Sequence, residues 1–146
     1  MNLKVSLKKN NPDVPDPVRQ HSDDVGADLT VVSVKKVRDG VFLLDLGVSA
    51  SPPAGYYLEL HCRSSIYKTD FMQANKVGII DPGYTGTLFM PVRYLGAENA
   101  DAAAQELVGK RFAQLILRKR EPFEIALVDE LPCSDRGSAG LGSTGA

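Results

Sequence analysis

An all-β domain is the fold class that this sequence predicts, and three observations point to it. Short runs of apolar residues alternate with polar ones, with the period of two that half-buried strands show. Glycine, proline and aspartate separate these runs at close intervals, as turn residues do. Residues 100–108, which are rich in alanine, form the one clear helical stretch. The pattern argues against an α/β wound sheet and fits a sandwich, a jelly roll or a small barrel.

The expected strands follow from the period of two. Leucine, valine and leucine alternate with polar residues at 3–8, and the same pattern returns at 57–61. The remaining runs are rich in β-branched, aromatic and other large apolar residues, which suit a pleated and half-buried surface. They lie at residues 29–37, 41–48, 87–95, 112–117 and 123–128.

Turn-forming residues define the connections between several strands. Asp39 and Gly40 lie between two of the expected strands, where a type I′ hairpin needs residues that tolerate positive φ. Residues 52–55 (PPAG) mark a second turn. Pro91 lies inside an apolar run, and because it cannot donate a backbone hydrogen bond it predicts an edge strand or a bulge there.

Length and composition predict one compact domain and exclude several kinds of partner. The chain has 146 residues, of which 43% are hydrophobic, enough to bury a core without metal or disulfide support. Its formal net charge of -1 gives no general affinity for nucleic acid or for acidic membranes. Cys62 and Cys133 have no metal-type spacing and are expected to be reduced thiols.

Neither a membrane span nor a signal peptide is expected. No window reaches the roughly 20 apolar residues that cross a bilayer, and residues 1–8 lack the uninterrupted apolar stretch of a secretory signal. We therefore expect a cytoplasmic protein, or a nuclear one if the chain comes from a eukaryote or a virus. Stable binding to nucleic acid or to a membrane is not expected.

The last residues, 134–146, cannot fold by themselves. The segment is rich in glycine and serine, and Leu141 is its only large apolar side chain. Free backbone N–H groups, the hydroxyls of Ser143 and Thr144 and the guanidinium of Arg136 suit a polyphosphate held elsewhere in the protein. The alternative is a disordered terminus. We divide the chain into a β domain, 1–133, and a flexible arm, 134–146.

Three short segments carry polar groups at strand ends. After one expected strand come Arg63, Ser64 and Ser65, whose guanidinium, hydroxyls and backbone amides could hold phosphate oxygens. Asp81 lies between two isoleucines and a Pro-Gly turn, which suits either a fixed catalytic carboxylate or an aspartate that caps the turn. Asp28 enters a strand, and its carboxylate suits either a hard cation such as Mg²⁺ or an exposed strand end.

Other polar residues give weaker signals. Gln114 lies inside an apolar run, so its amide needs hydrogen-bond partners if it faces inward. His21 and His61 stand apart from cysteine and from any Gly-x-Ser-x-Gly motif, and we interpret both as structural or surface residues. No Gly-x-x-x-x-Gly-Lys-Ser/Thr motif occurs, so a nucleotide site here is not of the P-loop type.

Five segments, taken in order, resemble the five motifs of the trimeric dUTPase family. They are VGADL at 25–29, RSS at 63–65, NKVGIIDPGYTG at 75–86, GKRFAQLI at 109–116 and RGSAGLGSTG at 136–145. The resemblance covers nearly the whole chain. It implies a distorted jelly-roll β-barrel that forms a homotrimer and exchanges its C-terminal arms, so that each active site takes residues from three chains.

The reaction that this resemblance implies is the hydrolysis of dUTP to dUMP and pyrophosphate, by attack of water on the α-phosphorus. In the cell this reaction would limit the incorporation of uracil into DNA and supply dUMP for thymidylate synthesis. Asp81 matches the family's catalytic carboxylate and would activate the water as a general base. Asp28 would bind Mg²⁺ through water, and the metal would hold the triphosphate for in-line attack.

The same resemblance assigns the substrate-binding residues. Asn75 would read the polar edge of uracil, and Tyr84 would pack on the deoxyribose and leave no room for a 2′-hydroxyl. Arg136 would reach the γ-phosphate from a neighbouring chain as the arm closes. Arg63 would either contact phosphate or brace the site. The implied substrate-binding set is Arg63, Ser64, Ser65, Asn75, Gly78, Tyr84, Gln114, Arg136, Leu141, Gly142, Ser143 and Thr144.

Some residues depart from the family pattern. Leu141 stands where the family has a phenylalanine that stacks on uracil, so it would cover the base without aromatic stacking. Ser65 and the pair Pro82-Gly83 are more similar to dCTP deaminases, which share the fold and are the main alternative. The catalytic glutamate of that family would fall at Pro91, which has no acid-base group. A non-catalytic regulatory trimer that binds nucleotide is the second alternative.

Overall fold

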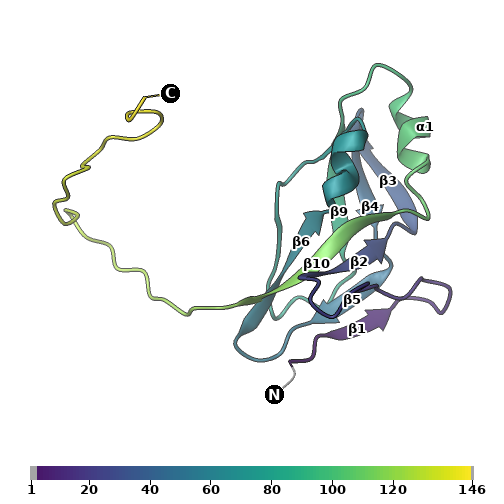
Figure 1. Ribbon diagram of the computed structural model, residues 1–146, viewed down its shortest axis with the longest axis horizontal. Coiled ribbons are helices and arrows are strands. Elements are labelled where there is room, and N and C mark those ends of the chain that lie inside the picture. Colours follow the sequence, from purple (N-terminus) through teal and green to yellow (C-terminus); the bar gives the residue numbers. More distant parts are fainter. Residues whose placement is uncertain (1–2, 146) are drawn as a thin grey trace.

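Ten strands and one short α-helix build the fold in the computed structural model, which describes residues 3–145 (Figure 1). Residues 1–2 of the expected β domain and residue 146 of the expected arm lie outside the described residues. The strands are β1 (Ser6–Lys9), β2 (Gly26–Thr30), β3 (Ser33–Arg38), β4 (Val41–Asp45), β5 (Val48–Ser51), β6 (Tyr56–Cys62), β7 (Phe71–Gln73), β8 (Gly78–Ile80), β9 (Phe89–Tyr94) and β10 (Arg111–Lys119). A 3₁₀ turn, η1 (Ser64–Lys68), follows β6, and the helix α1 (Ala100–Gln105) precedes β10.

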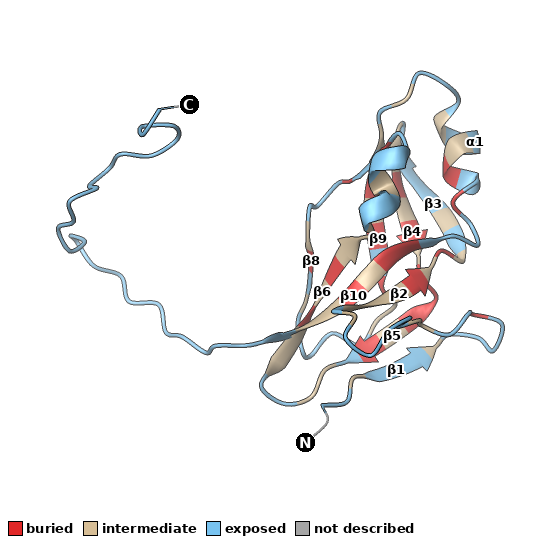
Figure 2. Ribbon diagram, in the orientation of Figure 1, coloured by how far each residue is buried: buried red, intermediate tan, exposed pale blue. Residues whose placement is uncertain are grey.

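The strands form two four-stranded antiparallel sheets and one antiparallel pair. The first sheet has the order β2-β10-β6-β8, the second has the order β3-β4-β9-β7, and β1 pairs with β5. Apolar side chains from both sheets meet in one buried core (Figure 2). The fully buried members include Phe42, Leu44, Leu58, Leu60, Met90 and Val92. This nearly all-β architecture of the jelly-roll type confirms the expected fold class.

Two expected strands are each divided in the structure. The run at 29–37 becomes β2 and β3, and the run at 41–48 becomes β4 and the start of β5. Gly47 explains the second break, because its backbone has a positive φ of 65° and its N–H donates to the Asp45 side chain at 2.7 Å. The pattern of apolar residues predicts which segments are buried, but it does not predict where a turn divides such a segment.

Turns form at both expected places, but the one at Asp39 and Gly40 is not of type I′, because only Gly40 has a positive φ. The interpretation of Pro91 was also wrong. Gly40 has a φ of 70° between the antiparallel strands β3 and β4, and Gly55 has a φ of 81° before β6. Pro91 lies in β9, which has β4 on one side and β7 on the other, and its pairing with β4 has no bulge. Its carbonyl accepts from the Ala74 N–H at 2.9 Å, just beyond the end of β7. The missing N–H of Pro91 therefore faces a side on which the neighbouring strand has ended.

Two regular elements differ in length from the sequence prediction. The helix ends at Gln105, short of the expected residue 108, and its first turn is capped by Asn99, whose side chain accepts from the Ala102 N–H at 3.0 Å. The first strand begins at Ser6 rather than at residue 3. Strand β7 and the turn η1 were not predicted, and β8 was expected only as the strand end before Asp81, because three-residue strands are too short to show a period.

Residues 123–128 were expected to form a strand, and in the single chain they do not. The last backbone hydrogen bond to the body runs from the Arg120 N–H to the Gly55 carbonyl, at 2.9 Å. Beyond it the chain leaves the body as an exposed, extended tail that ends with the arm (Figures 1 and 2). The alternating apolar pattern is present, but no described strand of the same chain pairs with it. None of the helices within residues 3–145 has the length and apolar character needed to cross a membrane.

Candidate active site

A polar pocket lies at one end of the first sheet. Asp28 on β2 pairs with Gln114 on β10, and Gln114 pairs in turn with His61 on β6, so the three share one row of the outward face. Arg63 and Ser64 directly follow β6. The pocket that these elements enclose has a volume of about 370 Å³ and is lined by Asp28, Arg63, Ser64 and Gln114, among others. Four of the residues expected from three separate segments therefore meet here.

Asp28 binds two guanidinium groups in this pocket. Its Oδ2 lies 2.9 Å from Arg63 Nε and 3.7 Å from Arg111 Nη1. Arg63 Nη1 also donates to the Arg111 carbonyl at 3.1 Å. Only 15% of the Asp28 side chain is exposed, whereas the side chains of Arg63 and Arg111 are 33% and 39% exposed. The carboxylate thus holds two cations side by side at a site that could receive anions.

Arg111 is a candidate functional residue that the sequence interpretation did not single out. Strict alternation along β10 would place residues 111 and 114 on opposite faces of the sheet. The pairing of β10 with β2 shifts register between Arg111 and Ala113, which is the signature of a bulge. The bulge brings Arg111 to the face that Gln114 occupies, and an unbroken period of two cannot reveal that.

Gln114 faces outward and is held by the backbone. Its Nε2 donates to the Cys62 carbonyl at 3.0 Å. A Cβ added to Gly26 would lie 2.5 Å from Gln114 Oε1, so residue 26 must be glycine for the amide to keep this position. The glycine of the first segment and the glutamine of the fourth are therefore packed against each other.

Asp81 and Tyr84 form a separate group at the far end of β8. Asp81 is exposed, and its carbonyl accepts from the Tyr84 N–H at 3.0 Å. The Tyr84 hydroxyl donates to the Thr87 carbonyl at 2.7 Å, and its side chain is 45% exposed. A Cβ on Gly86 would lie 2.6 Å from that hydroxyl oxygen, so the ring rests against bare backbone. Tyr84 is a surface residue with a fixed orientation and is not part of the core.

Asn75 lies in the tight turn between β7 and β8. The turn places Lys76 at a positive φ of 61° and closes with a hydrogen bond from the Val77 N–H to the Asn75 carbonyl, at 2.6 Å. The Asn75 side chain accepts from Gln73 Nε2 at 3.0 Å. Gly78 packs closely on Leu60, because a Cβ there would lie 3.1 Å from Leu60 Cβ, and it would be in ordinary contact with Asn75 Nδ2 at 3.6 Å.

The two groups do not meet within one chain. Ile80 pairs with Leu58, so Asp81 follows at the Tyr57 end of β6, whereas Asp28 lies in the row of His61 at the other end and on the opposite edge strand. Four residues along a strand and three strand spacings across a sheet correspond to roughly 20 Å. Neither Asp81 nor Tyr84 lines the pocket around Asp28.

The arm stays apart from both groups. Its hydrogen bonds are local, such as those from Arg136 Nε to the Ala139 carbonyl at 2.7 Å and from the Ser143 N–H to the Gly140 carbonyl at 3.1 Å. Leu141 is fully exposed and has a positive φ of 45°. Figure 1 shows the arm, in yellow, well away from the sheets. The expected arm residues Arg136, Leu141, Gly142, Ser143 and Thr144 therefore reach no site of their own chain.

The two histidines lie beside the pocket. His21 contributes to its lining, and its backbone N–H donates to Asp24 at 2.9 Å. His61 Nε2 lies 2.8 Å from Glu59, which also accepts from the Tyr57 hydroxyl at 2.6 Å. The hydrogen bonds from Tyr57 and His61, together with the charge of Arg118, lower the pKa of Glu59 although partial burial opposes the shift. His61 is thus held on its own strand by Glu59.

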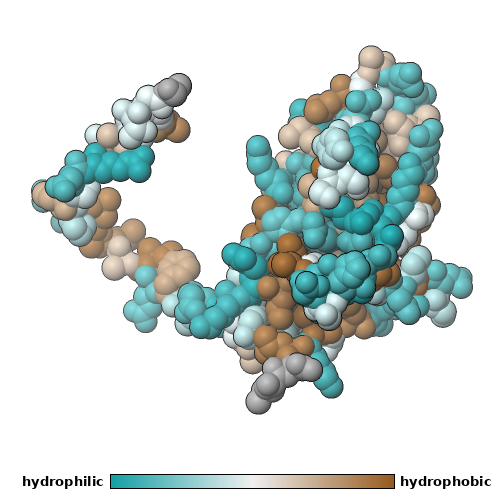
Figure 3. Space-filling view, viewed as in Figure 1, coloured by the Kyte–Doolittle hydropathy of each residue, from teal (hydrophilic) through white to brown (hydrophobic). Residues whose placement is uncertain are grey.

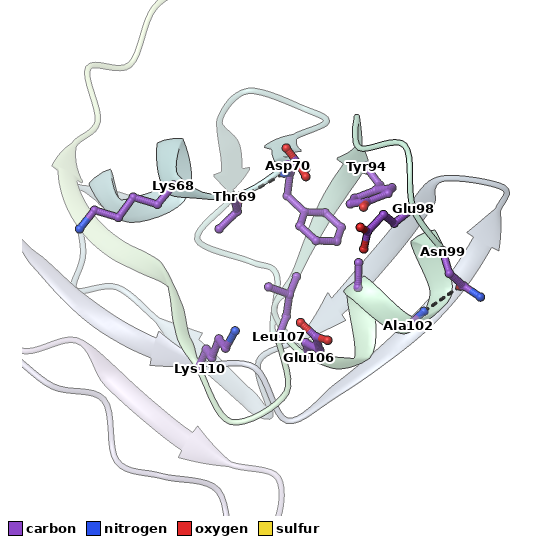
Figure 4. A pocket seen from close by; sticks show the side chains of 12 residues that line it. Lys68, Thr69, Asp70, Tyr94, Glu98, Asn99, Ala102, Glu106, Leu107 and Lys110 are labelled. Carbon is purple, nitrogen blue, oxygen red and sulfur yellow. Dashed lines mark hydrogen bonds between the residues drawn. The ribbon is translucent and has the colours of Figure 1, made fainter.

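A second pocket, of about 350 Å³, lies between η1, the end of β9 and α1 (Figure 4). Figure 4 shows Asp70, Tyr94 and Glu98 on its wall, and the hydrogen bond by which Asn99 caps the helix. Charges of both signs line it, including Lys68 and Lys110. Because none of the expected site residues belongs to this wall, we place the candidate active site at the first pocket and at the end of β8.

Comparisons with known proteins agree with the sequence motifs. The family model described as dUTPase matches residues 13–145. The deoxyuridine 5'-triphosphate nucleotidohydrolase of Streptomyces avermitilis is 34% identical over 98% of this chain and 81% of its own length. That of Bifidobacterium longum subsp. infantis is also 34% identical, over 97% of this chain and 89% of its own length.

Solved structures show the same fold. A variant of the Staphylococcus bacteriophage 80alpha dUTPase with dUpNHpp aligns with a TM-score of 0.76 at 23% identity, over 98% of this chain and 99% of the phage chain. A variant of the dUTPase from phage phi11 of S. aureus, described as revealing the coordination of a structural Mg(II) ion, aligns with a TM-score of 0.70 at 22% identity. It covers 89% of this chain and 99% of its own.

Proposed function

The chain belongs to the dUTPase family, and from this premise we propose how it hydrolyses dUTP to dUMP and pyrophosphate. The observation that carries the proposal is the convergence of Asp28, Arg63, Ser64 and Gln114, from three of the five motifs, on one anion-sized pocket. Incubation of the purified protein with dUTP and Mg²⁺ should release pyrophosphate. Release of ammonia from dCTP instead, or binding without turnover, would favour the deaminase or the non-catalytic alternative.

The pocket is the proposed site for the triphosphate. The Ser64 hydroxyl and the Gln114 amide offer neutral donors, and Arg111 offers a guanidinium. Arg63 already uses Nε toward Asp28 and Nη1 toward the Arg111 carbonyl, which leaves it chiefly a brace for the other groups. Ser65 adds a hydroxyl and a backbone N–H at the start of η1.

Replacement of Arg111 by glutamine is expected to lower kcat/KM for dUTP by about 10- to 100-fold, because a charge-assisted hydrogen bond to phosphate contributes about 1.5–3 kcal/mol. Steady-state pyrophosphate release measures this change. Arg118→Gln is the matched control, since Arg118 lies on the same strand and pairs only loosely with Glu59, at 3.6 Å. Equal losses in both variants would show that strand charge, rather than contact with phosphate, is responsible.

The turn before β8 and the residues that follow this strand are the proposed sites for the nucleoside and the reacting water. Asp81 would act as the general base for water that attacks the α-phosphorus. Asn75 and the turn around Gly78 would bind uracil, and Tyr84 would pack on the deoxyribose. The fixed hydroxyl of Tyr84 supports this role, because a ring that is anchored to the Thr87 carbonyl can exclude a 2′-hydroxyl.

A methyl group at residue 86 should disturb the sugar site alone. In Gly86→Ala the new Cβ would overlap the Tyr84 hydroxyl, so the ring must move. We expect kcat/KM for dUTP to fall about tenfold or more and the preference for dUTP over UTP to decrease, while the fold persists. Parallel assays on the two nucleotides measure both effects. Gly83→Ala, where an added Cβ meets nothing within 4 Å, is the control.

Magnesium would enter with the triphosphate rather than occupy a protein cage. Within residues 3–145 no group of three or more His, Cys, Asp or Glu side chains is placed to hold a metal. Both arginine contacts of Asp28 use Oδ2, so Oδ1 can still accept from a metal-bound water. When bound, Mg²⁺ would neutralise phosphate charge. Asp28 and Arg63 would keep the donors of the pocket in position for the substrate.

A homotrimer would bring the two groups of residues together. Because Asp81 lies roughly 20 Å from Asp28 in one chain, a complete site needs the end of β8 from one copy and the pocket from another. The arm of a third copy would then supply Arg136, Ser143 and Thr144 to the phosphates, with Leu141 and Gly142 over the base. The arm's exposure and its extension away from its own body support this exchange.

The segment before the arm supports the same assembly. Phe123, Ile125 and Leu127 alternate along it and are between 81% and 96% exposed. Figure 3 shows hydrophobic residues along this part of the tail. An apolar groove of about 450 Å³, lined by Leu3, Val5, Leu7 and other residues, lies beside β1. A second copy of the chain would cover such a groove with a strand of matching alternation.

A further inference from the structure

Gln73 is a buried amide, only 5% exposed, and its position in the chain matches none of the five motifs. Its side chain crosses from β7 to β6, where it makes hydrogen bonds with two backbone groups. Oε1 accepts from the Cys62 N–H at 2.8 Å, and Nε2 donates to the Leu60 carbonyl at 2.9 Å. Strand β8 begins only at Gly78, opposite Leu60, so the amide occupies the place of a missing strand partner.

The orientation of this amide is dictated by the backbone. A backbone N–H can only donate and a carbonyl can only accept, so Gln73 must present oxygen to Cys62 and nitrogen to Leu60. A flipped amide would face two buried groups with the wrong polarity and leave both unsatisfied. The Cys62 N–H and the Leu60 carbonyl of β6 thus fix which way the Gln73 amide points. The second N–H of Gln73 Nε2 therefore also points in a fixed direction.

This second N–H contacts Asn75. Gln73 Nε2 donates to Asn75 Oδ1 at 3.0 Å, and the Asn75 amide must therefore turn its oxygen inward and its nitrogen outward. Nδ2 lies beside Gly78, where an added Cβ would be 3.6 Å away, and Asn75 is an exposed residue of the turn. A nucleobase that reaches this surface meets a hydrogen-bond donor in a fixed position.

We propose that Gln73 is a specificity-determining positioning residue, which locks the Asn75 amide with its donor toward the base and so selects uracil over cytosine. The inference rests on the proposed function, in which Asn75 reads the base. At the position where uracil carries the O4 carbonyl, cytosine carries an amino group. A fixed Nδ2 donates to O4 but opposes the amino group with a second donor.

Two substitutions at residue 73 separate this role from a structural one. Gln73→Leu removes the lock, so the Asn75 amide can rotate and present either atom. Gln73→Glu keeps an acceptor for the Cys62 N–H and loses the donor to the Leu60 carbonyl. As a carboxylate it attracts Asn75 Nδ2 and so turns Oδ1 toward the base. The ratio of kcat/KM for dUTP to that for dCTP should fall about tenfold in the first variant and further in the second.

Binding measurements make the test independent of turnover. Calorimetric titration with dUMP and with dCMP should show the same loss of preference in both variants, and Asn75→Asp, which presents only an acceptor, should also lose it. Val48→Ala, a buried change in β5, is the control and should lower the thermal midpoint without altering either ratio.

The outcomes distinguish the inference from the function on which it rests. Wild-type protein that prefers dUMP to dCMP but releases no pyrophosphate from dUTP would overturn the proposed hydrolysis. The role of Gln73 would still be supported if its variants lose that preference. Folded Gln73 variants with ratios within twofold of wild type would overturn the lock. If neither Gln73 variant folds, Asn75→Asp at the exposed turn decides, and unchanged preference in it refutes the inference.

Discussion

Replacement of Asp81 by asparagine is expected to lower kcat for dUTP by about 10²- to 10⁴-fold, the range that a positioned general base contributes. The amide is nearly isosteric and retains the backbone hydrogen bond between residues 81 and 84, so the turn should persist. Affinity for the dUTP analogue dUpNHpp should stay close to that of the wild type. Single-turnover pyrophosphate release measures the first effect, and calorimetric titration measures the second.

Asp101→Asn provides the matched control for this variant. Asp101 is an exposed carboxylate on α1 that pairs with Lys36 at 3.0 Å, far from the proposed chemistry. Its loss should leave turnover unchanged. An Asp81→Asn variant that turns over dUTP within a few fold of wild type would show that another group activates the water, and the base would have to be sought elsewhere.

Deletion of residues 134–146 should have a comparable effect by a different route. The arm makes only local hydrogen bonds in its own chain, so its removal exposes no core and should not lower the thermal midpoint. It would remove the guanidinium of Arg136 and the hydroxyls of Ser143 and Thr144 from the phosphates and leave the site open to water. Because one such donor can contribute about 10²- to 10³-fold in kcat, we expect at least a 10²-fold loss.

Three measurements define the outcome of the deletion. Light scattering should give the same number of subunits for the truncated and the full chain, and thermal unfolding should give the same midpoint. Pyrophosphate release should then fall in the truncated protein and in Arg136→Gln, but not in Ser138→Ala, an arm variant outside the proposed contacts. Full activity of the truncated protein would mean that the arm is an inert terminus, the other interpretation that its composition allows.

Much of the fold was predictable because burial imposes a period on the sequence. The alternation at 57–61 became the centre of β6, and the glycines at 40 and 55 marked turns where the backbone has a positive φ. Strands of three residues, such as Phe71–Gln73, carry no period. Residues 123–128 have the pattern of a strand, but pattern alone cannot say whether a partner strand lies in the same molecule.

The site residues that belong to a sequence motif could be predicted. Those that reach the site only through tertiary contacts could not. Asp28 and Gln114 come from separate motifs and lie side by side on neighbouring strands, as residues of one pocket are expected to do. Arg111 reaches that pocket through a bulge, which no alternation reveals. Gln73 resembles any polar residue of a short strand until its partners on β6 are known. Such residues are identified only when the pairing of the strands is seen.

The distance between Asp81 and the Asp28 pocket has a consequence for genetics. In the proposed trimer, a chain that lacks the Asp81 carboxylate inactivates only the site to which it contributes the end of β8. The same chain still contributes its pocket and its arm to the other sites. A chain without the arm inactivates a different site, the one to which its arm would contribute. Two alleles that are each inactive alone would then complement each other when co-expressed, since mixed trimers regain sites built wholly from intact parts.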